Sequence, residues 1–213
     1  MTKPRVLLAD DHTLVVEGFR KLLEEEFDLV GTVEDGRALL KTAPTLQPDV
    51  VLLDIAMPSL NGIEAARQLK KMMPEVKIIF VTMHADPAYV TEGFRAGASG
   101  YLLKRSAAAE LAQAIQAVLK GQHYVTPLIT GDLVRTLLDG STELLSRPAL
   151  LTLRQREVLQ LVAEGHSMKE IANTLKISVK TVEFHKAQIM EQLNLHTTAE
   201  LTKYAIAHGL TSP

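Results

Sequence analysis

The chain contains no cysteine and no tryptophan, and only 4% of its 213 residues are aromatic. Without cysteine it can form neither disulfide bonds nor metal sites built on thiolates. No apolar run approaches the roughly 18 residues that a membrane-spanning helix needs, and no charged-then-apolar leader stands at Met1. From these absences we expect a cytoplasmic protein with no membrane segment.

The two signs of charge are nearly balanced. The chain has 23 basic and 25 acidic residues, a formal net charge of −2, and residues 150–213 hold seven basic and six acidic ones. This balance alone gives no indication of nucleic-acid binding. Hydrophobic residues make up 46% of the chain, which at this length suffices for the cores of two domains.

Up to about residue 120, short apolar runs alternate with longer periodic segments. Each run has the length of a buried strand, and each intervening segment is long enough for a helix. The pattern predicts an α/β fold with a five-stranded, doubly wound parallel sheet and helices on both faces. The expected strands are residues 6–9, 29–33, 50–53, 78–81 and 100–103.

Carboxylates follow directly on two of these expected strands. Asp54 comes after residues 50–53, and Asp10 and Asp11 come after residues 6–9. Because the carboxyl ends of neighbouring parallel strands meet at one edge of the sheet, we expect the three acids to lie together there. Three acids in one crevice need a cation, and hard oxygen ligands with room for water suit magnesium, Mg²⁺.

Residues 122–148 are less regular and are interpreted as a linker with one helix. Thr126 and Pro127 match the N-cap and first position of that helix, and Asp139-Gly140 would end it. The alternative is an extra helix that packs on the first domain.

Beyond residue 149 the sequence predicts a small all-α domain of four helices. Three capping boxes precede apolar-periodic segments, and a fourth helix is expected over residues 178–193. The short turn before residue 178 has the spacing of a helix-turn-helix, with 178–193 as the recognition helix. A helical bundle of another purpose is the alternative. The capping boxes run from Thr152 to Gln155, from Ser167 to Glu170 and from Thr197 to Glu200.

The outward face of the expected recognition helix carries residues suited to DNA. Phe184 is unusual on a solvent face and would be covered by thymine methyl groups or by a neighbouring phosphate-clamped backbone. Glu183 would accept a hydrogen bond from cytosine N4 or would repel the wrong bases. Lys169, Lys180 and Lys186 would bind phosphates, which positions the protein without specifying a sequence. Thr181 lies on the same face. Each residue alone has an ordinary interpretation as solvated surface.

Motifs along the whole chain resemble one known family. Residues 1–120 resemble a response-regulator receiver domain, and residues 150–210 resemble the LuxR-type helix-turn-helix of the NarL/FixJ subfamily. The receiver resemblance rests on Asp10-Asp11-His12, Asp54 with Met57-Pro58 and Asn61-Gly62, Thr82, the run from Ala96 to Tyr101, and Lys104. The second rests on Leu151-Thr152, Arg156-Glu157-Val158-Leu159, Ala163-Glu164-Gly165, Lys169-Glu170-Ile171-Ala172, Ile177-Ser178, Thr181-Val182 and His185.

The receiver resemblance implies that Asp54 accepts a phosphoryl group from a histidine kinase. Asp11, Asp54 and the Ala56 carbonyl would hold Mg²⁺, with Asp10 reaching the ion through water. Phosphoryl transfer depends on charge neutralisation and in-line positioning more than on acid–base help.

Three further residues are implied in the phosphoryl contacts and the switch. Lys104 would pair with a phosphoryl oxygen, and Thr82 would bond another oxygen after phosphorylation. Tyr101 would then follow Thr82 inward, which is the family's two-state switch.

We therefore expect a receiver domain in residues 1–121, the linker in 122–148 and a DNA-binding domain in 149–213. The expected function is phosphorylation-controlled binding to a double-stranded DNA operator as a homodimer. Glu183 and Thr198 stand where relatives often carry a basic residue, so intrinsic DNA affinity should be weak without dimerisation or a partner protein.

Two alternatives remain at this point. The receiver would serve only as a dimerisation module that ignores phosphate, or the chain would be an aspartyl-phosphate phosphohydrolase. Such an enzyme needs a second acid two residues after its nucleophile, and Ala56 stands there, so we do not expect an enzyme.

Overall fold

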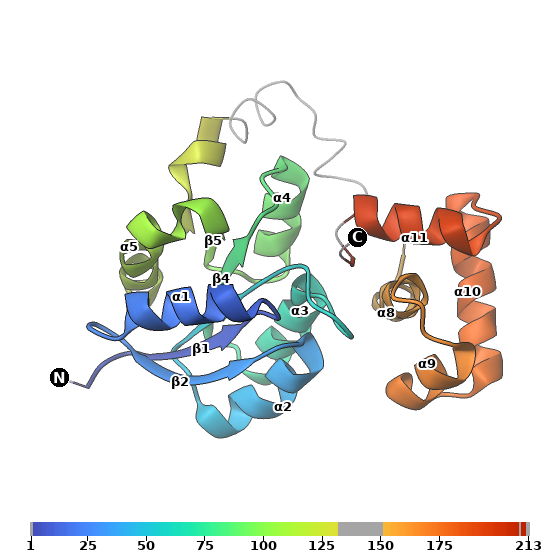
Figure 1. Ribbon diagram of the computed structural model, residues 1–213, viewed down its shortest axis with the longest axis horizontal. Coiled ribbons are helices and arrows are strands. Elements are labelled where there is room, and N and C mark those ends of the chain that lie inside the picture. Colours follow the sequence, from blue (N-terminus) through green and yellow to red (C-terminus); the bar gives the residue numbers. More distant parts are fainter. Residues whose placement is uncertain (1, 132–150, 209, 212–213) are drawn as a thin grey trace.

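The computed structural model describes residues 2–131, 151–208 and 210–211, which form an α/β domain and a helical domain side by side (Figure 1). The α/β domain is built on one parallel sheet with the strand order β2-β1-β3-β4-β5-β6. The crossover between β1 and β3 confirms the predicted doubly wound arrangement. The strands are β1 (Arg5–Ala9), β2 (Asp28–Val33), β3 (Val50–Leu53), β4 (Lys77–Thr82), β5 (Gly100–Leu103) and β6 (Tyr124–Val125).

Helices cover both faces of this sheet, and a separate apolar core fills the space on each side. On one face, α1 and α5 pack on the sheet, and the core between them contains Phe19, Leu52 and Ile115. On the other face, α2, α3 and α4 pack on the sheet, and the core there contains Leu53, Phe80 and Tyr101. The helices are α1 (Thr13–Leu23), α2 (Gly36–Leu46), α3 (Gly62–Met72), α4 (Pro87–Arg95) and α5 (Ala107–Leu119), with a 3₁₀ turn, η1 (Lys104–Ser106), before α5.

Among the described residues the sheet has six strands, so the prediction of five was one short. The additional strand, β6, has only two residues and lies within the predicted linker, and two residues are too few to show a strand pattern in the sequence. Thr126 follows β6 and is buried, with its Oγ1 accepting a hydrogen bond from the Leu103 N–H at 3.1 Å. Residues 127–131 are helical, and the rest of the predicted linker helix lies outside the described residues.

The helical domain has the four expected helices, α8 (Leu153–Ala163), α9 (Met168–Leu175), α10 (Val179–Leu193) and α11 (Thr198–Ala207). All three predicted capping boxes are present, with both reciprocal hydrogen bonds in each. Lys176 ends α9 in the left-handed conformation, and Ser178 caps α10. This tight connection places α9 and α10 as a helix-turn-helix.

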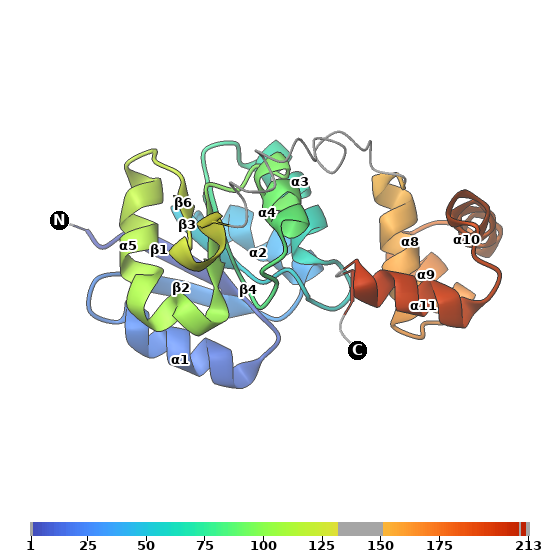
Figure 2. The same ribbon diagram turned by 90° about the horizontal axis from the view of Figure 1, so that it is seen from above.

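The helical domain contacts the α/β domain through α8, on the side of the α/β domain where α3 lies. Both views show α10 on the far side of the helical domain from the sheet (Figures 1 and 2). None of the helices in the described part of the chain is long and apolar enough to span a bilayer.

Candidate functional site

The register of the sheet brings the predicted acids together. Ala9 pairs with Leu53 across β1 and β3, so Asp10 and Asp54, the next residues of each strand, lie side by side. The Asp54 N–H continues the ladder by donating to the Ala9 carbonyl at 2.9 Å. Ligand atoms of Asp10, Asp11, His12 and Asp54 all lie within 4.8 Å of one another. The structure thus groups the three acids as expected, and adds His12, which was named above only as part of a motif and not as a member of this group.

Lys104 reaches into this group from the 3₁₀ turn after β5. Its Nζ lies 2.6 Å from Asp54 Oδ2 and 2.7 Å from Asp10 Oδ2. Burial by itself would lower the pKa of the Lys104 ammonium, but the two carboxylates outweigh burial and raise that pKa. The lysine is therefore a permanent cation that neutralises part of the acidic crevice.

Burial has the opposite consequence at Asp54, which is only 4% exposed. Desolvation raises the pKa of its carboxyl above the usual range, and the attraction of Lys104 offsets only part of that rise. Asp54 Oδ1 also accepts a hydrogen bond from the Ile55 N–H at 2.7 Å. One oxygen is thus held by the backbone, and the other faces Lys104.

The donor chemistry of this group fits Mg²⁺. Asp10, Asp11 and Asp54 offer carboxylate oxygens, the ligands that a hard divalent cation prefers, at one edge of the sheet. His12 Nδ1 lies 3.0 Å from Asp11 Oδ1 and 3.1 Å from Asp10 Oδ1, so it is a hydrogen-bonding neighbour of the acids. Ala56, the fourth predicted ligand, lies in the loop that follows Asp54.

The side chains of Thr82 and Tyr101 contact the same short segment of backbone. Both are fully buried, Thr82 at the end of β4 and Tyr101 within β5. Thr82 Oγ1 accepts a hydrogen bond from the His84 N–H at 3.3 Å, and the Tyr101 hydroxyl donates to the His84 carbonyl at 2.9 Å. His84 therefore bridges the two predicted switch side chains, with Tyr101 turned inward.

His84 was not predicted from the sequence, because its role depends on a contact with Tyr101 of another strand. Its ring stacks on Tyr89 with the ring centroids 4.4 Å apart. Burial lowers the pKa of His84, against the opposing attraction of Asp54 and Asp86. The imidazole is consequently neutral near pH 7 and adds no positive charge to the crevice.

On α10, three of the predicted DNA-contacting residues share an exposed face: Lys180, Glu183 and Phe184. Phe184 is 58% exposed, which is unusual for an aromatic side chain without a partner surface. Thr181 is half-buried, and its Oγ1 lies 2.8 Å from Ser178 Oγ, so its hydroxyl is engaged at the helix cap.

The other two predicted phosphate contacts lie apart from that face. Lys186 is half-buried and donates from Nζ to Thr198 Oγ1 at 3.0 Å, which directs it toward α11. Lys169 is exposed near the start of α9. The structure therefore brings Lys180, Glu183 and Phe184 together on the outward face of α10, while Lys186 lies at the edge of that face.

Charged residues also join the two domains, and the sequence analysis did not anticipate them. Arg156 of α8 lies with Nη1 3.2 Å from Glu64 Oε1 of α3, and Gln68 Nε2 donates to Glu157 Oε1 at 3.1 Å. Burial raises the pKa of Glu64, and the attraction of Arg67 and Arg156 only partly offsets it. No local sequence pattern reports such contacts, because their partners lie about 90 residues apart.

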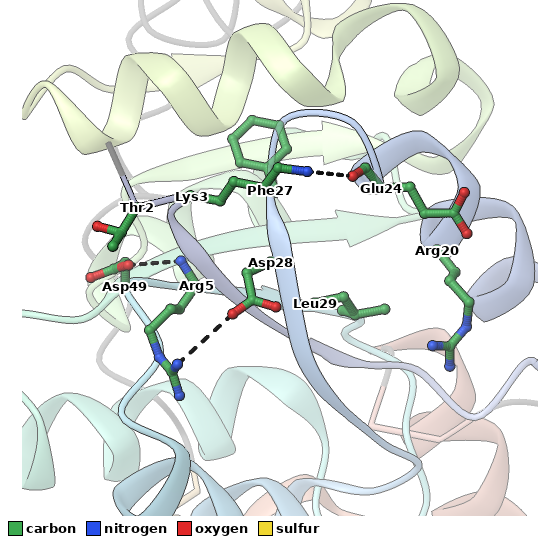
Figure 3. A pocket seen from close by; sticks show the side chains of 9 residues that line it. All are labelled: Thr2, Lys3, Arg5, Arg20, Glu24, Phe27, Asp28, Leu29 and Asp49. Atoms are coloured by element: carbon green, nitrogen blue, oxygen red, sulfur yellow. Dashed lines mark hydrogen bonds and ion pairs between the residues drawn. The ribbon is translucent and has the colours of Figure 1, made fainter.

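A hollow of about 790 Å³ lies at the opposite edge of the sheet, where β1, β2 and β3 begin (Figure 3). Its positive charges already have partners: Arg5 Nη1 lies 3.8 Å from Asp28 Oδ2, Arg5 Nη2 donates to the Leu46 carbonyl at 2.7 Å, and Arg20 Nε lies 3.7 Å from Glu17 Oε1. Lys3 Nζ donates to the Glu24 carbonyl at 2.8 Å. Because the hollow lies at the opposite edge of the sheet from the acidic group, it is not a candidate for the chemistry of that group.

Comparison with known proteins covers both domains. The chain matches the response regulator receiver domain over residues 6–116 and the luxR family of bacterial regulatory proteins over residues 149–205. Transcriptional regulatory protein DegU of Brevibacillus brevis is 37% identical, over 97% of this chain and 94% of its own. Oxygen regulatory protein NreC of Staphylococcus carnosus is 35% identical, over 97% and 98%.

Solved structures give the same result. The RcsB response regulator of Salmonella typhimurium is similar with a TM-score of 0.66 and 32% identity, covering 96% of this chain and 97% of that chain. A structure described as the complex of RcsB with DNA is similar with a TM-score of 0.57 and 31% identity, covering 95% and 98%.

Proposed function

The chain belongs to the two-component response regulators that join a receiver domain to a LuxR-type DNA-binding domain, and from this premise we propose that phosphorylation of Asp54 controls its binding to DNA. The observation that carries the proposal is the buried Asp54 carboxylate, which lies at a strand end beside two acids and within 2.6 Å of Lys104 Nζ. A histidine kinase is the partner that would supply the phosphoryl group.

In the proposed reaction, an Asp54 carboxylate oxygen attacks the phosphorus atom, and the bond between phosphorus and the kinase histidine nitrogen breaks. Asp11, Asp54 and the Ala56 carbonyl would hold Mg²⁺, with Asp10 acting through water, and the ion would supply the charge neutralisation that the transfer needs. Lys104 is already next to the attacking carboxylate, so its ammonium can pair with a phosphoryl oxygen without travelling far.

The new phosphoryl group would act on the switch through Thr82. Its hydroxyl would leave the His84 N–H and bond a phosphoryl oxygen, while the His84 carbonyl keeps the Tyr101 hydroxyl inward. A local change of charge would in this way bias the β4–α4 segment between two arrangements.

The output would be binding of double-stranded operator DNA by a homodimer, with α10 in the major groove. Lys180 would bind phosphate, while Glu183 and Phe184 would face base edges. Lys169, Thr181 and Lys186 complete the proposed contact set, Lys186 from the edge of that face. A regulator of chromosomal DNA acts where the DNA is, so we place it in the cytoplasm.

We propose a regulator and not an enzyme, because the relatives are described as regulatory proteins. Ala56, at the position where a phosphohydrolase carries its second acid, supports the same choice.

The test is phosphorylation of Asp54→Asn with a small-molecule phosphodonor and Mg²⁺, followed by intact mass and by DNA affinity. Asn is nearly isosteric but is not a nucleophile, so we expect no added phosphate with the fold unchanged by circular dichroism. Asp49→Asn, at the opposite end of β3, is the matched control and should incorporate phosphate like the parent protein.

Phosphate on the Asp54→Asn protein would show that the acceptor lies elsewhere. Phosphorylation of the parent protein without any change in DNA affinity would instead favour the alternative in which the receiver serves only as a dimerisation module.

A further inference from the structure

The DNA-binding domain inserts one glutamine side chain against the loop that follows Asp54. Gln160 of α8 is completely buried at 0% exposure, and its Nε2 donates to the Met57 carbonyl at 2.8 Å. Its Oε1 accepts from the Asn61 N–H at 2.8 Å. Since a carbonyl only accepts and an N–H only donates, these two partners fix the orientation of the Gln160 amide. One side chain therefore joins both ends of the segment from Met57 to Asn61.

A second residue of α8 holds the middle of the same segment. The Ser59 N–H donates to the Glu164 carboxylate, at 3.2 Å from Oε1 and 3.3 Å from Oε2, and Ser59 has a positive φ of 65°. Gln160 Nε2 also donates to Glu164 Oε1 at 2.7 Å, which links the two side chains. Glu164 thus stabilises a backbone conformation that a non-glycine residue rarely adopts.

The same loop is tied back to Ile55, the residue that follows Asp54. The Ile55 carbonyl accepts from the Met57 N–H at 3.1 Å and from the Gly62 N–H at 2.8 Å. A Cβ atom at Gly62 would lie 1.9 Å from the Asp54 carbonyl oxygen, so only glycine allows this close return of the chain. The loop is therefore a small closed unit next to the proposed metal ligands.

Ala56 lies between these two sets of bonds. The peptide unit that contains the Ala56 carbonyl also contains the Met57 N–H, which is bonded to Ile55. The next carbonyl along the chain, that of Met57, is bonded to Gln160. The peptide unit of Ala56 is fixed on one side by the loop itself and on the other side by the DNA-binding domain.

We propose that Gln160 is a positioning residue for the receiver's magnesium site, so that the site reaches full affinity only while the two domains are docked. The inference rests on the proposed function, because it assumes that the Ala56 carbonyl is a ligand. Partners that orient a metal ligand from outside typically change metal affinity by about 10–100-fold when they are removed. Ala56 would be one ligand among several, so we expect a loss at the lower end, about tenfold.

Coupling of this kind acts in both directions. If docking raises the affinity for Mg²⁺, then Mg²⁺ must favour docking by the same factor. The Mg²⁺ affinity of the receiver would consequently depend on whether the DNA-binding domain is docked. Docking would in turn depend on bound Mg²⁺, before any phosphoryl group arrives.

The experiment is a calorimetric titration of Mg²⁺ into the full chain, with Gln160→Met compared to the parent protein. Methionine keeps the volume and the apolar stem of glutamine but makes neither hydrogen bond, so the Mg²⁺ dissociation constant should rise about tenfold. Gln160→Asn is a second variant that keeps an amide too short to join Met57 and Asn61, and its dissociation constant should also rise. Thermal melting by circular dichroism checks that both variants are folded.

Gln68→Met is the matched control, because Gln68 also bonds across the domain boundary but contacts Glu157 rather than the loop. Its Mg²⁺ affinity should equal that of the parent protein. Equal or tighter binding in both Gln160 variants would overturn the positioning role and leave the proposed function intact. Failure of the parent protein to bind Mg²⁺ would instead overturn the proposed function, and this inference with it.

Discussion

At Asp54, burial and a neighbouring cation act in opposite directions on one carboxyl group. Burial raises its pKa, while Lys104, whose Nζ lies 2.6 Å from Oδ2, stabilises the charged carboxylate and acts to lower the pKa. A phosphorylated aspartate would carry more negative charge in the same place, so the crevice needs a further cation as well as Lys104. The residue is therefore held in a state that a change of charge can disturb, and Thr82, at the end of the adjacent strand β4, is the residue that we propose responds.

Thr82→Ala should keep Asp54 phosphorylation but lose most of the gain in dimerisation or DNA binding that phosphorylation gives. The reason is that alanine has no hydroxyl to bond a phosphoryl oxygen, so the charge at Asp54 no longer biases the segment that contains His84. Phosphate incorporation by intact mass and operator affinity on the same sample measure the two effects separately. Thr82→Ser retains the hydroxyl and should behave like the parent protein, and unchanged activation in Thr82→Ala would remove Thr82 from the mechanism.

The helix α10 is organised by the contrast between its buried and exposed faces. Val182 and Ile189 are buried in the core of the helical domain, while Lys180, Glu183 and Phe184 face outward. The exposed face thus carries one basic, one acidic and one aromatic residue, a poor match to a phosphate backbone and a better match to base edges. Specific contacts should therefore matter more in this helix than general attraction to DNA.

Lys180→Ala should weaken binding to all DNA sequences alike and reduce the slope of log affinity against log salt by about one unit. Glu183→Lys should raise the affinity for random DNA, and it should alter the preference among operators by roughly 1–3 kcal/mol per affected base pair if the side chain contacts a base. Both are measured by fluorescence anisotropy on one operator and one random duplex across a salt series.

Glu191→Lys, which makes the same charge reversal near the other end of α10, should change the affinity less than Glu183→Lys. If Lys180→Ala and Glu183→Lys both leave affinity and salt slope unchanged, α10 is not the recognition helix, and the helical domain is better described as a protein-interaction domain.

In the whole molecule, the two domains are docked through α8 while α10 stays on the far side (Figure 2). Glu164 lies at this boundary, where it accepts a hydrogen bond from the Ser59 N–H, and desolvation raises the pKa of its carboxyl above the usual range. A pKa that is higher in the docked state means that docking takes up protons. The stabilisation of the docked state by this protonation is complete below the ordinary carboxyl pKa, and it is lost as the pH rises through the raised pKa.

The docked form should therefore become more populated as the pH falls from neutral toward 5, which small-angle scattering would record as a smaller radius of gyration. Glu164→Gln resembles the protonated carboxyl at every pH, so this variant should be more compact at neutral pH and respond less to acid. Glu191→Gln, on an exposed carboxyl of α10, should show the same pH response as the parent protein. Expansion of the parent protein on acidification would contradict the assigned sign.

Local patterns in the sequence were enough to predict most of the fold. The apolar runs placed five strands within one residue of their ends, and the capping boxes at Thr152, Ser167 and Thr197 were all found in the structure. These features depend on residues at most a few positions apart, which is why a single sequence reports them. The acidic group followed from the same patterns, because the strand ends of a parallel sheet share one edge.

Other features were decided only by the tertiary structure. The strand β6 is too short to leave a pattern in the sequence. His84 bonds to both Thr82 and Tyr101 only because the fold brings these two residues together from different strands. The bond from Gln160 to Met57 joins residues 103 positions apart. The sequence by itself thus determined the elements and their chemistry, since period and capping are local, whereas the fit between surfaces that meet only after folding determined how the two domains touch.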